Sequence, residues 1–146
     1  MLIGKYKHSV DNRNRIFIPV KFRADIGAKC VVSKDIIYSC LNIYPMEQWK
    51  NYTQKIEDLP TILLRDLREL IYPNSDEVDT DSQGRIILNQ RLCEDIGILN
   101  VKEVIIVGVH THAQIWDISE WENFNSNIKN KENKESIITE LLKIGF

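Results

Sequence analysis

Two short segments of the chain place an aspartate four residues before an arginine, and these side chains are the first candidates for chemistry. One segment runs from Asp11 to Arg15, and the other runs from Asp81 to Arg85. An aspartate at the head of a turn accepts hydrogen bonds from backbone N–H groups two residues on. We therefore predict that Asp11 and Asp81 form turns rather than act as catalytic carboxylates. Each arginine can pair with the aspartate of its own turn, and such a pair does not exclude a second role in binding.

The residues inside the two segments decide which turn can contact a ligand. Asn14 and Gly84 stand at the fourth position, and asparagine and glycine are the residues that best tolerate positive φ. Arg13 stands at the first tip, where the second turn has Gln83. Arginine is the commonest specific reader of guanine, so a tip arginine suits contact with phosphates and base edges. The alternative for Arg13 is an ordinary solvated charge.

The sequence contains none of the common catalytic or phosphate-binding motifs. It has no Gly-rich phosphate loop, no Gly-x-Ser-x-Gly and no Cys-x-x-Cys. The best metal candidate is the pair His110 and His112, which we interpret as an exposed turn between two strands. Cys30, Cys40 and Cys93 lack metal-ligand spacing and are interpreted as thiols in a reducing compartment. We therefore expect no enzyme activity, no cofactor and no bound metal.

Charge is distributed unevenly along the chain, although the net charge of −2 is ordinary for a cytosolic protein. Residues 5–23 hold six basic residues and one acidic residue, a net charge of +5, whereas residues 75–93 hold two basic and four acidic residues, a net charge of −2. We expect Lys5 and Lys7 to contact phosphates and His8 to pack or to contact a phosphate. Because residues 75–93 are acidic, the sequence does not decide whether Arg85 contacts DNA. The candidate DNA-binding residues are Arg13, Arg15, Lys5, Lys7, Asn12, Asn14 and Arg85.

The elements that position these turns are repeated as well. Asp25-Ile26-Gly27 returns as Asp95-Ile96-Gly97, and Ile43-Tyr44 with Trp49 returns as Ile115-Trp116 with Trp121. A period of about seventy residues marks a duplicated supersecondary unit. The apolar runs on either side of each turn predict a hairpin, and Pro19 is expected to open a short helix that ends at Gly27.

The rest of the chain divides into strands, a helical pair and a polar end. Strands are predicted near residues 30–33, 41–44, 104–107 and 114–116, and helices after Pro45, after Pro60 and near Ser119. Residues 125–136 are expected to be mobile or weakly helical. The final amphipathic segment is interpreted as a helix that docks on its own core or on a neighbouring subunit. The predicted divisions are 5–48 for the first repeat, 49–75 for connecting helices, 76–121 for the second repeat and 122–146 for the polar segment and last helix.

Each repeat alone buries too little apolar surface to be stable. We therefore expect a β-rich α+β fold in which the two repeats form one pseudo-twofold, barrel-like core with flanking helices. The two hairpins should then lie side by side at one end. No apolar run reaches the length of a membrane span, and the first residues lack the apolar region of a signal peptide, so a cytoplasmic location is expected.

The motifs together resemble the MraZ family. They are the twofold Asp-x-x-x-Arg, the opening Met-Leu-Ile-Gly-Lys-Tyr, Tyr-Pro-Met-Glu-x-Trp at 44–49, and Val-Gly-Val followed by Ile-Trp at 107–116. The resemblance covers residues 1–124, and the hairpin-and-helix unit also resembles the wider AbrB-like swapped-hairpin class. Two positions differ from the family pattern: Asn14 replaces a glycine, and Asn89 replaces a proline. Asparagine can hold the turn and can cap the following helix.

The resemblance implies a sequence-specific transcriptional regulator with two AbrB-like repeats. Such proteins bind double-stranded DNA with repeated short boxes in the promoter of the division and cell-wall gene cluster, assemble into homo-oligomeric rings and associate with the nucleoid. The family's DNA-contacting arginine falls on Arg15, and Arg85 is its counterpart. The competing hypothesis is an antitoxin-like interaction module of the AbrB-like class, whose tail masks another protein.

Overall fold

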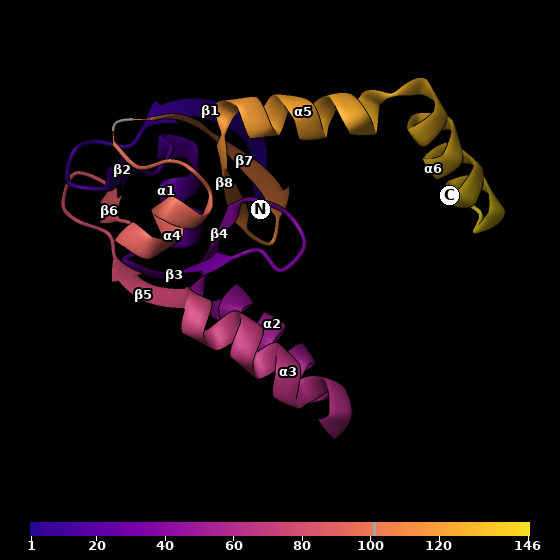
Figure 1. The fold of residues 1–146 in the computed structure, drawn as a ribbon, viewed down its shortest axis with the longest axis horizontal. Coiled ribbons are helices and arrows are strands. Elements are labelled where there is room, and N and C mark those ends of the chain that lie inside the picture. Colours follow the sequence, from indigo (N-terminus) through magenta and orange to yellow (C-terminus); the bar gives the residue numbers. More distant parts are fainter. Residues whose placement is uncertain (101) are drawn as a thin grey trace.

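A six-stranded antiparallel sheet forms the centre of the molecule in the computed structural model, which describes residues 1–100 and 102–146 (Figure 1). In spatial order its strands are β1 (Leu2–Ser9), β7 (Glu103–His110), β8 (Ala113–Asp117), β4 (Leu41–Pro45), β3 (Lys29–Lys34) and β5 (Ser75–Asp79). A second, two-stranded sheet pairs β2 (Arg15–Phe17) with β6 (Arg85–Ile87). The fold is therefore α+β, as predicted, but it is not β-rich, because its described α-helices contain more residues than its strands.

Six α-helices and two 3-10 turns within the described residues connect and cover these strands. They are η1 (Val20–Phe22), α1 (Arg23–Ile26), α2 (Met46–Glu57), α3 (Thr61–Ile71), η2 (Tyr72–Asn74), α4 (Gln90–Asp95), α5 (Ile118–Lys129) and α6 (Lys131–Lys143). Helix α2 packs on β3 and β4, and α5 packs on β7 and β8. Asn89 accepts hydrogen bonds from the backbone N–H groups of Arg91 and Leu92, so the expected cap of α4 is present.

The strands on either side of each turn pair across the two halves of the chain. Strand β1 pairs with β7, β5 pairs with β3, and β2 pairs with β6. The predicted hairpins are therefore wrong beyond the turns themselves, because β1 and β2 are not paired with each other within the described residues. Cross-pairing lets both halves bury their apolar residues in one core, where Ile16, Ile18 and Phe22 meet Ile86 and Leu88.

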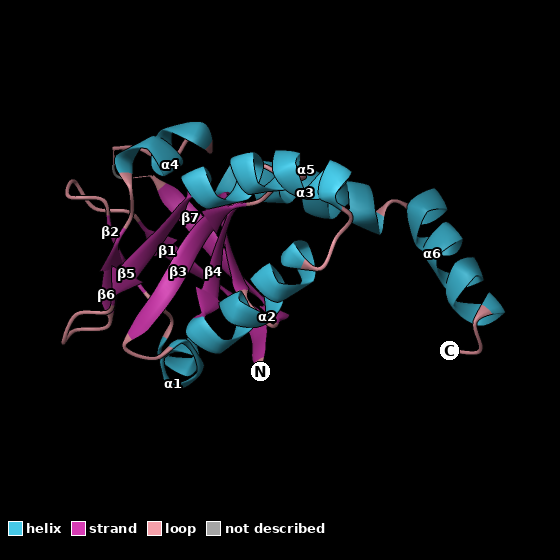
Figure 2. Ribbon diagram, turned by 90° about the horizontal axis from the view of Figure 1, so that it is seen from below, coloured by secondary structure: helices cyan, strands magenta, loops and turns pink. Residues whose placement is uncertain are grey.

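The six-stranded sheet is open in the part of the chain that the structure describes, since β1 and β5 are its edge strands. The expected barrel-like closure is not seen in the strand pairing. Both turns lie at one end of the molecule, beside β2 and β6, as the ribbons in Figures 1 and 2 show. The α2–α3 pair and α6 project from the other side of the sheet.

The last helix does not dock on the core. Helix α6 packs against α5, has no buried residue, and extends away from the body of the molecule (Figure 1). Docking on its own core is therefore the wrong alternative. The polar stretch before it is helical on both sides of Asn130, whose side chain accepts a hydrogen bond from the backbone N–H of Glu132 and so begins α6.

Candidate nucleic-acid interface

The first turn is held by one carboxylate. Asp11 Oδ1 accepts hydrogen bonds from the backbone N–H groups of Arg13 at 2.9 Å and Arg15 at 2.8 Å. Its Oδ2 accepts a hydrogen bond from Arg15 Nε at 2.7 Å. Asn14 completes the turn with φ of 58°, the left-handed conformation that asparagine tolerates. The backbone N–H of Arg15, followed by its guanidinium, holds the pKa of Asp11 below its ordinary value.

The second turn repeats this geometry. Asp81 Oδ1 accepts hydrogen bonds from the backbone N–H groups of Gln83 and Arg85, both at 2.9 Å, and Oδ2 accepts one from Arg85 Nε at 2.8 Å. The pKa of Asp81 is lowered for the same reason as that of Asp11. Gly84 takes the left-handed position with φ of 81°. The sequence repeat thus corresponds to two turns with the same hydrogen bonds.

Each turn accepts one backbone hydrogen bond from the residue just after the strand that follows the other turn. The N–H of Ile18 donates to the carbonyl of Gly84 at 2.8 Å, and the N–H of Leu88 donates to the carbonyl of Asn14 at 2.7 Å. Between them, the β2–β6 ribbon places Phe17 opposite Arg85 in the strand register. The two turns and the ribbon therefore form one continuous surface, which we call the turn end.

The arginines of the turn end differ in exposure. Arg13 is exposed at the first tip, whereas Arg15 and Arg85 are half-buried beside their aspartates. The guanidinium carbon of Arg85 lies 5.8 Å from the centroid of the exposed Phe17 ring. This distance is within the range of a cation–π contact. Arg85 is thus held by both Asp81 and Phe17.

Arg23 is a residue of the turn end that sequence reasoning missed. Its Nε donates to the carbonyl of Ile18 at 3.0 Å, and a Cβ added to Gly84 would lie 2.4 Å from that same nitrogen. Glycine at position 84 suits both the left-handed φ, which asparagine holds in the first turn, and the close approach of the Arg23 side chain. No signal in the sequence linked the helix of one repeat to the turn of the other.

The lysines predicted to contact phosphates lie on β1 rather than on the turn. Lys5 and Lys7 line a hollow of about 350 Å³ between β1 and α5. Lys5 Nζ lies 6.0 Å from the centroid of Trp121. His8, further along β1, has its pKa lowered by burial and then by the charge of Arg23. The structure therefore does not gather all the predicted basic residues at the tip.

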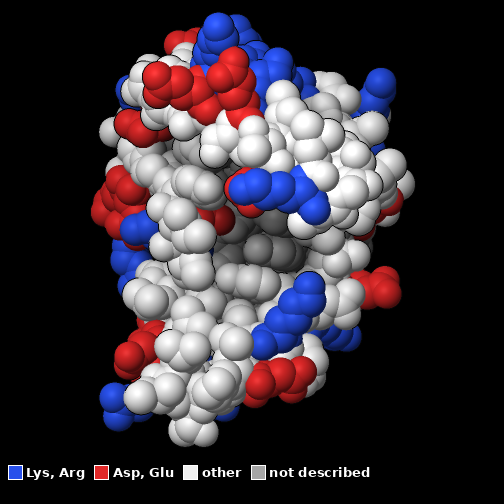
Figure 3. Space-filling model, turned by 90° about the vertical axis from the view of Figure 1, so that its right-hand side faces the viewer, with Lys and Arg blue, Asp and Glu red and all other residues white. Residues whose placement is uncertain are grey.

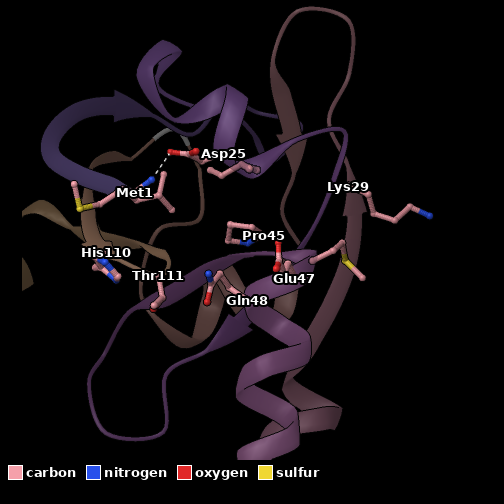
Figure 4. A pocket seen from close by; sticks show the side chains of 11 residues that line it. Met1, Asp25, Lys29, Pro45, Glu47, Gln48, His110 and Thr111 are labelled. Carbon is pink, nitrogen blue, oxygen red and sulfur yellow. Dashed lines mark hydrogen bonds and ion pairs between the residues drawn. The ribbon is translucent and has the colours of Figure 1, made fainter.

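The histidines and cysteines singled out in the sequence lie in separate surroundings. His110 lines a cavity of about 390 Å³ (Figure 4), whereas His112 stacks on Tyr44 with ring centroids 4.7 Å apart. No group of His, Cys, Asp or Glu side chains that could hold a metal occurs within the described residues. Burial raises the pKa of the Cys93 thiol to about 11, and Cys30 and Cys40 are also buried free thiols.

The side of the molecule that faces away from the turns carries few charged side chains near its centre. Figure 3 shows this side as largely uncharged and hollowed at its centre, with Lys, Arg, Asp and Glu interspersed around it. No helix in the described part of the chain combines the length and the apolar character needed to cross a membrane.

Sequence comparison decides the family. The family model described as "MraZ protein, putative antitoxin-like" matches residues 1–65 and 71–142. The chain belongs to the MraZ family. The gap between the two matched segments falls inside α3, so each segment of the MraZ match contains one of the two turns.

Two curated MraZ relatives cover the whole chain, and a third covers most of it. The protein named transcriptional regulator MraZ from Acetivibrio thermocellus is 36% identical over 149 residues, with all of both chains covered, and the one from Syntrophomonas wolfei gives the same values. The transcriptional regulator MraZ from Clostridium tetani is 37% identical over 128 residues, which cover 86% of this chain and 87% of the relative.

Proposed function

We propose that this chain is a sequence-specific DNA-binding transcriptional regulator without catalytic activity, and that the turn end holds the DNA. The observation that carries the proposal is the pair of matched turns at one end of the molecule, which backbone hydrogen bonds join to each other's repeat. An exposed arginine stands at the tip of the more basic turn. A two-stranded ribbon fits the major groove of DNA. The relatives named as transcriptional regulators support the same function.

The arrangement of Arg15 suits recognition of DNA. Asp11 occupies its Nε, which leaves the two terminal amino groups of the guanidinium to bind a phosphate or the edge of a guanine. A side chain that is already held loses less conformational entropy on binding. Arg13, with Asn12 and Asn14 beside it, supplies the exposed contact, and Lys5 and Lys7 contact phosphates where the DNA extends along β1.

The fold proposed for this function is the duplicated AbrB-like swapped hairpin. Cross-pairing of β1 with β7 and of β5 with β3 supports it, because each pairing joins the first strand of one repeat to the third strand of the other. The proposed divisions remain residues 5–48, 49–75, 76–121 and 122–146. In this arrangement the β2–β6 pair lies on the pseudo-twofold axis that relates the two repeats.

The proposed target is the promoter that the family binds, with repeated short boxes ahead of the division and cell-wall gene cluster. The proposed DNA-binding form is a homo-oligomeric ring. Its proposed location is the cytoplasm, in association with the nucleoid. Footprinting on the promoter upstream of this protein's own gene tests this directly. We expect protection of several regularly spaced boxes. Protection of no box, at low salt and saturating protein, would contradict the proposal.

Helix α6 is proposed to join neighbouring copies in the ring. Its apolar side chains Ile137, Ile138 and Leu142 are 45% to 68% exposed, and an apolar hollow of about 290 Å³ lies between α5 and α6. Deleting residues 131–146 should reduce the mass of the assembly measured by light scattering. The unfolding temperature of the core should stay nearly constant, because α6 buries no residue. An assembly of unchanged mass would show that α6 is not the contact.

The second candidate function is the antitoxin-like interaction module. The same exposed apolar residues of α6 favour it, because a partner protein could cover them in place of a neighbouring copy. Purification from the native host distinguishes the two. A stoichiometric small protein that co-purifies through α6 would favour the interaction module, and a homo-oligomer that binds the box array would favour the regulator.

A further inference from the structure

Two aromatic triads, seventy-two residues apart, have nearly the same geometry. The first triad is Tyr44, Trp49 and Tyr52, and the second triad is Trp116, Trp121 and Phe124. The three distances between ring centroids are 5.5, 5.1 and 5.7 Å in the first triad. The equivalent distances are 5.7, 4.8 and 5.8 Å in the second triad. Each triad joins a strand of the sheet to the helix that follows it.

Only the second triad is covered by a further tyrosine. Tyr38, from the loop between β3 and β4, packs with its ring centroid 4.8 Å from that of Phe124 and 6.2 Å from that of Trp116. The residue equivalent to Tyr38 is His110, which has φ of 76° and lines another cavity. Within the described residues, Tyr52 therefore contacts no aromatic ring outside its own triad, whereas its equivalent Phe124 contacts Tyr38.

A cavity borders the first triad, whose Tyr44 is covered by His112 but whose Tyr52 has no cover like that of Phe124. This cavity of about 220 Å³ is lined by the rings of Tyr44, Tyr52 and His112, with Gln48, Asn51 and Lys55 among its polar residues. It is smaller than the roughly 300–1,000 Å³ typical of pockets for drug-sized ligands. The cavity therefore suits one planar ring system, with the rest of the ligand outside.

We propose that this cavity binds the base of a free purine nucleoside or nucleotide. Tyr44 already stacks on Tyr52 at 5.1 Å and on His112 at 4.7 Å, so the base stacks on the remaining face of the Tyr52 ring. The amides of Gln48 and Asn51 each carry a donor and an acceptor, as hydrogen bonding to the edge of a base requires. A purine covers more of the aromatic surface than a pyrimidine does, which favours the larger base.

Charge around the cavity indicates that the base contributes more than the phosphate does. Lys55 lines the cavity and can attract a phosphate. The carboxylate of Asp35 also lies near, because its charge, next to burial, raises the pKa of Tyr52. These opposite charges largely offset each other. Helix α2 projects from the side of the sheet away from the turns (Figures 1 and 2), so the base comes from a free ligand rather than from DNA held at the turn end.

The duplication supplies a matched pair of variants to test this site. Asn51 lines the cavity, and its equivalent Asn123 lies at the same place on α5 beside the covered triad; both side chains are exposed. Asn51→Ala and Asn123→Ala should therefore both leave the fold intact. Calorimetric titration of the full chain with adenosine, guanosine, their 5′-monophosphates and a single-stranded oligonucleotide measures the binding.

We expect wild-type protein to bind one purine nucleoside per chain, with the monophosphate changing the affinity little. Asn51→Ala should weaken binding about tenfold, the loss expected for one hydrogen bond, and Asn123→Ala should leave it unchanged. Absence of binding at low-millimolar nucleoside would overturn the proposal. This is also the result expected if a neighbouring copy occupied the cavity. Equal weakening by both variants, or binding of the oligonucleotide alone, would also overturn it.

Discussion

Arg15 and Arg85 make the same contacts within their turns but stand in opposite charge surroundings. Each donates its Nε to its own aspartate, at 2.7 Å and 2.8 Å respectively. Residues 5–23 around Arg15 carry a net charge of +5, and residues 75–93 around Arg85 carry −2. Lys29 offsets part of the acidic charge by pairing with Glu77 at 3.4 Å and Asp79 at 3.8 Å. The two arginines are therefore structural equivalents that need not be equivalent in binding.

Replacing each arginine by alanine separates these roles. Arg15→Ala should weaken DNA binding tenfold or more, because a charge-assisted hydrogen bond contributes about 1.5–3 kcal/mol. Arg85→Ala should have a clearly smaller effect because acidic residues around it repel the DNA backbone. Titration of labelled promoter DNA at fixed salt measures both affinities.

Each variant controls for the loss of the arginine–aspartate pair in the other, and Arg85→Ala loses in addition the contact with the Phe17 ring. Circular dichroism should show equal retention of structure in the two variants. Equal losses of DNA affinity in well-folded variants would mean that both turns contact DNA equivalently.

The two turn aspartates predict how the fold responds to acid. Hydrogen bonds from the backbone N–H groups of Arg15 and Arg85 hold the pKa of Asp11 and of Asp81 below the ordinary value. Because the pKa is lower in the folded state, their stabilising contribution is fully present above the unfolded pKa of about 3.9 and is lost as the pH falls through the folded value. Stability should therefore decrease below about pH 4.

The double variant Asp11→Asn with Asp81→Asn tests this dependence, because an amide can fill the same space without titrating in this range. Unfolding by urea should show that the variant is less stable than the wild type at neutral pH. Between about pH 4 and pH 2 the difference should become smaller. A difference that stays constant over this range would show that the two carboxylates do not cause the acid sensitivity.

At the scale of the elements, local patterns predicted the turns and the short helices but not the partners of the strands. The spacing of Asp11 and Arg15 fixes a turn by itself, because all its hydrogen bonds are local. Alternating apolar residues indicate a strand, but they do not say which strand lies beside it. The pairing of β1 with β7 joins Lys5 to Val107, and such distant contacts leave no local signal.

Two further features of the site lay beyond the sequence for related reasons. Arg23 lies against Gly84 of the other repeat, and no local pattern in the sequence predicts a contact between such distant residues. The amphipathic pattern of the last segment correctly indicated a helix. It could not show whether Ile137 and Leu142 would meet this core or another surface, because any apolar surface satisfies the same pattern.

Cross-pairing predicts that half of the chain cannot fold alone. A fragment of residues 1–75 keeps the pairing of β3 with β4, but β1 loses β7 and β2 loses β6. Expressed alone, it should be unfolded or should self-associate so that a second copy replaces the missing half. Sedimentation and NMR dispersion measure this. A monomeric fragment with a well-dispersed spectrum would contradict the shared core.

At the scale of the whole molecule, the turns and the projecting helices lie on different sides. The turn end presents Arg13, and the side that faces away from the turns is largely uncharged (Figure 3). One chain with net charge −2 and a single basic turn neutralises few phosphates, so it should bind DNA weakly at physiological salt. Several chains held together, each presenting one turn end, would convert weak contacts into avidity.

The most direct test of this account is the affinity of the wild-type protein for three duplexes at one salt concentration. One duplex carries a single promoter box, one carries the native array, and one carries the array with about 5 bp inserted between boxes, half of the 10–10.5 bp helical repeat. We predict that the native array binds orders of magnitude more tightly than the single box. The shifted array should lose most of that gain, because its next box faces away. A single box bound as tightly as the native array, or no binding to any duplex at low salt, would contradict the account.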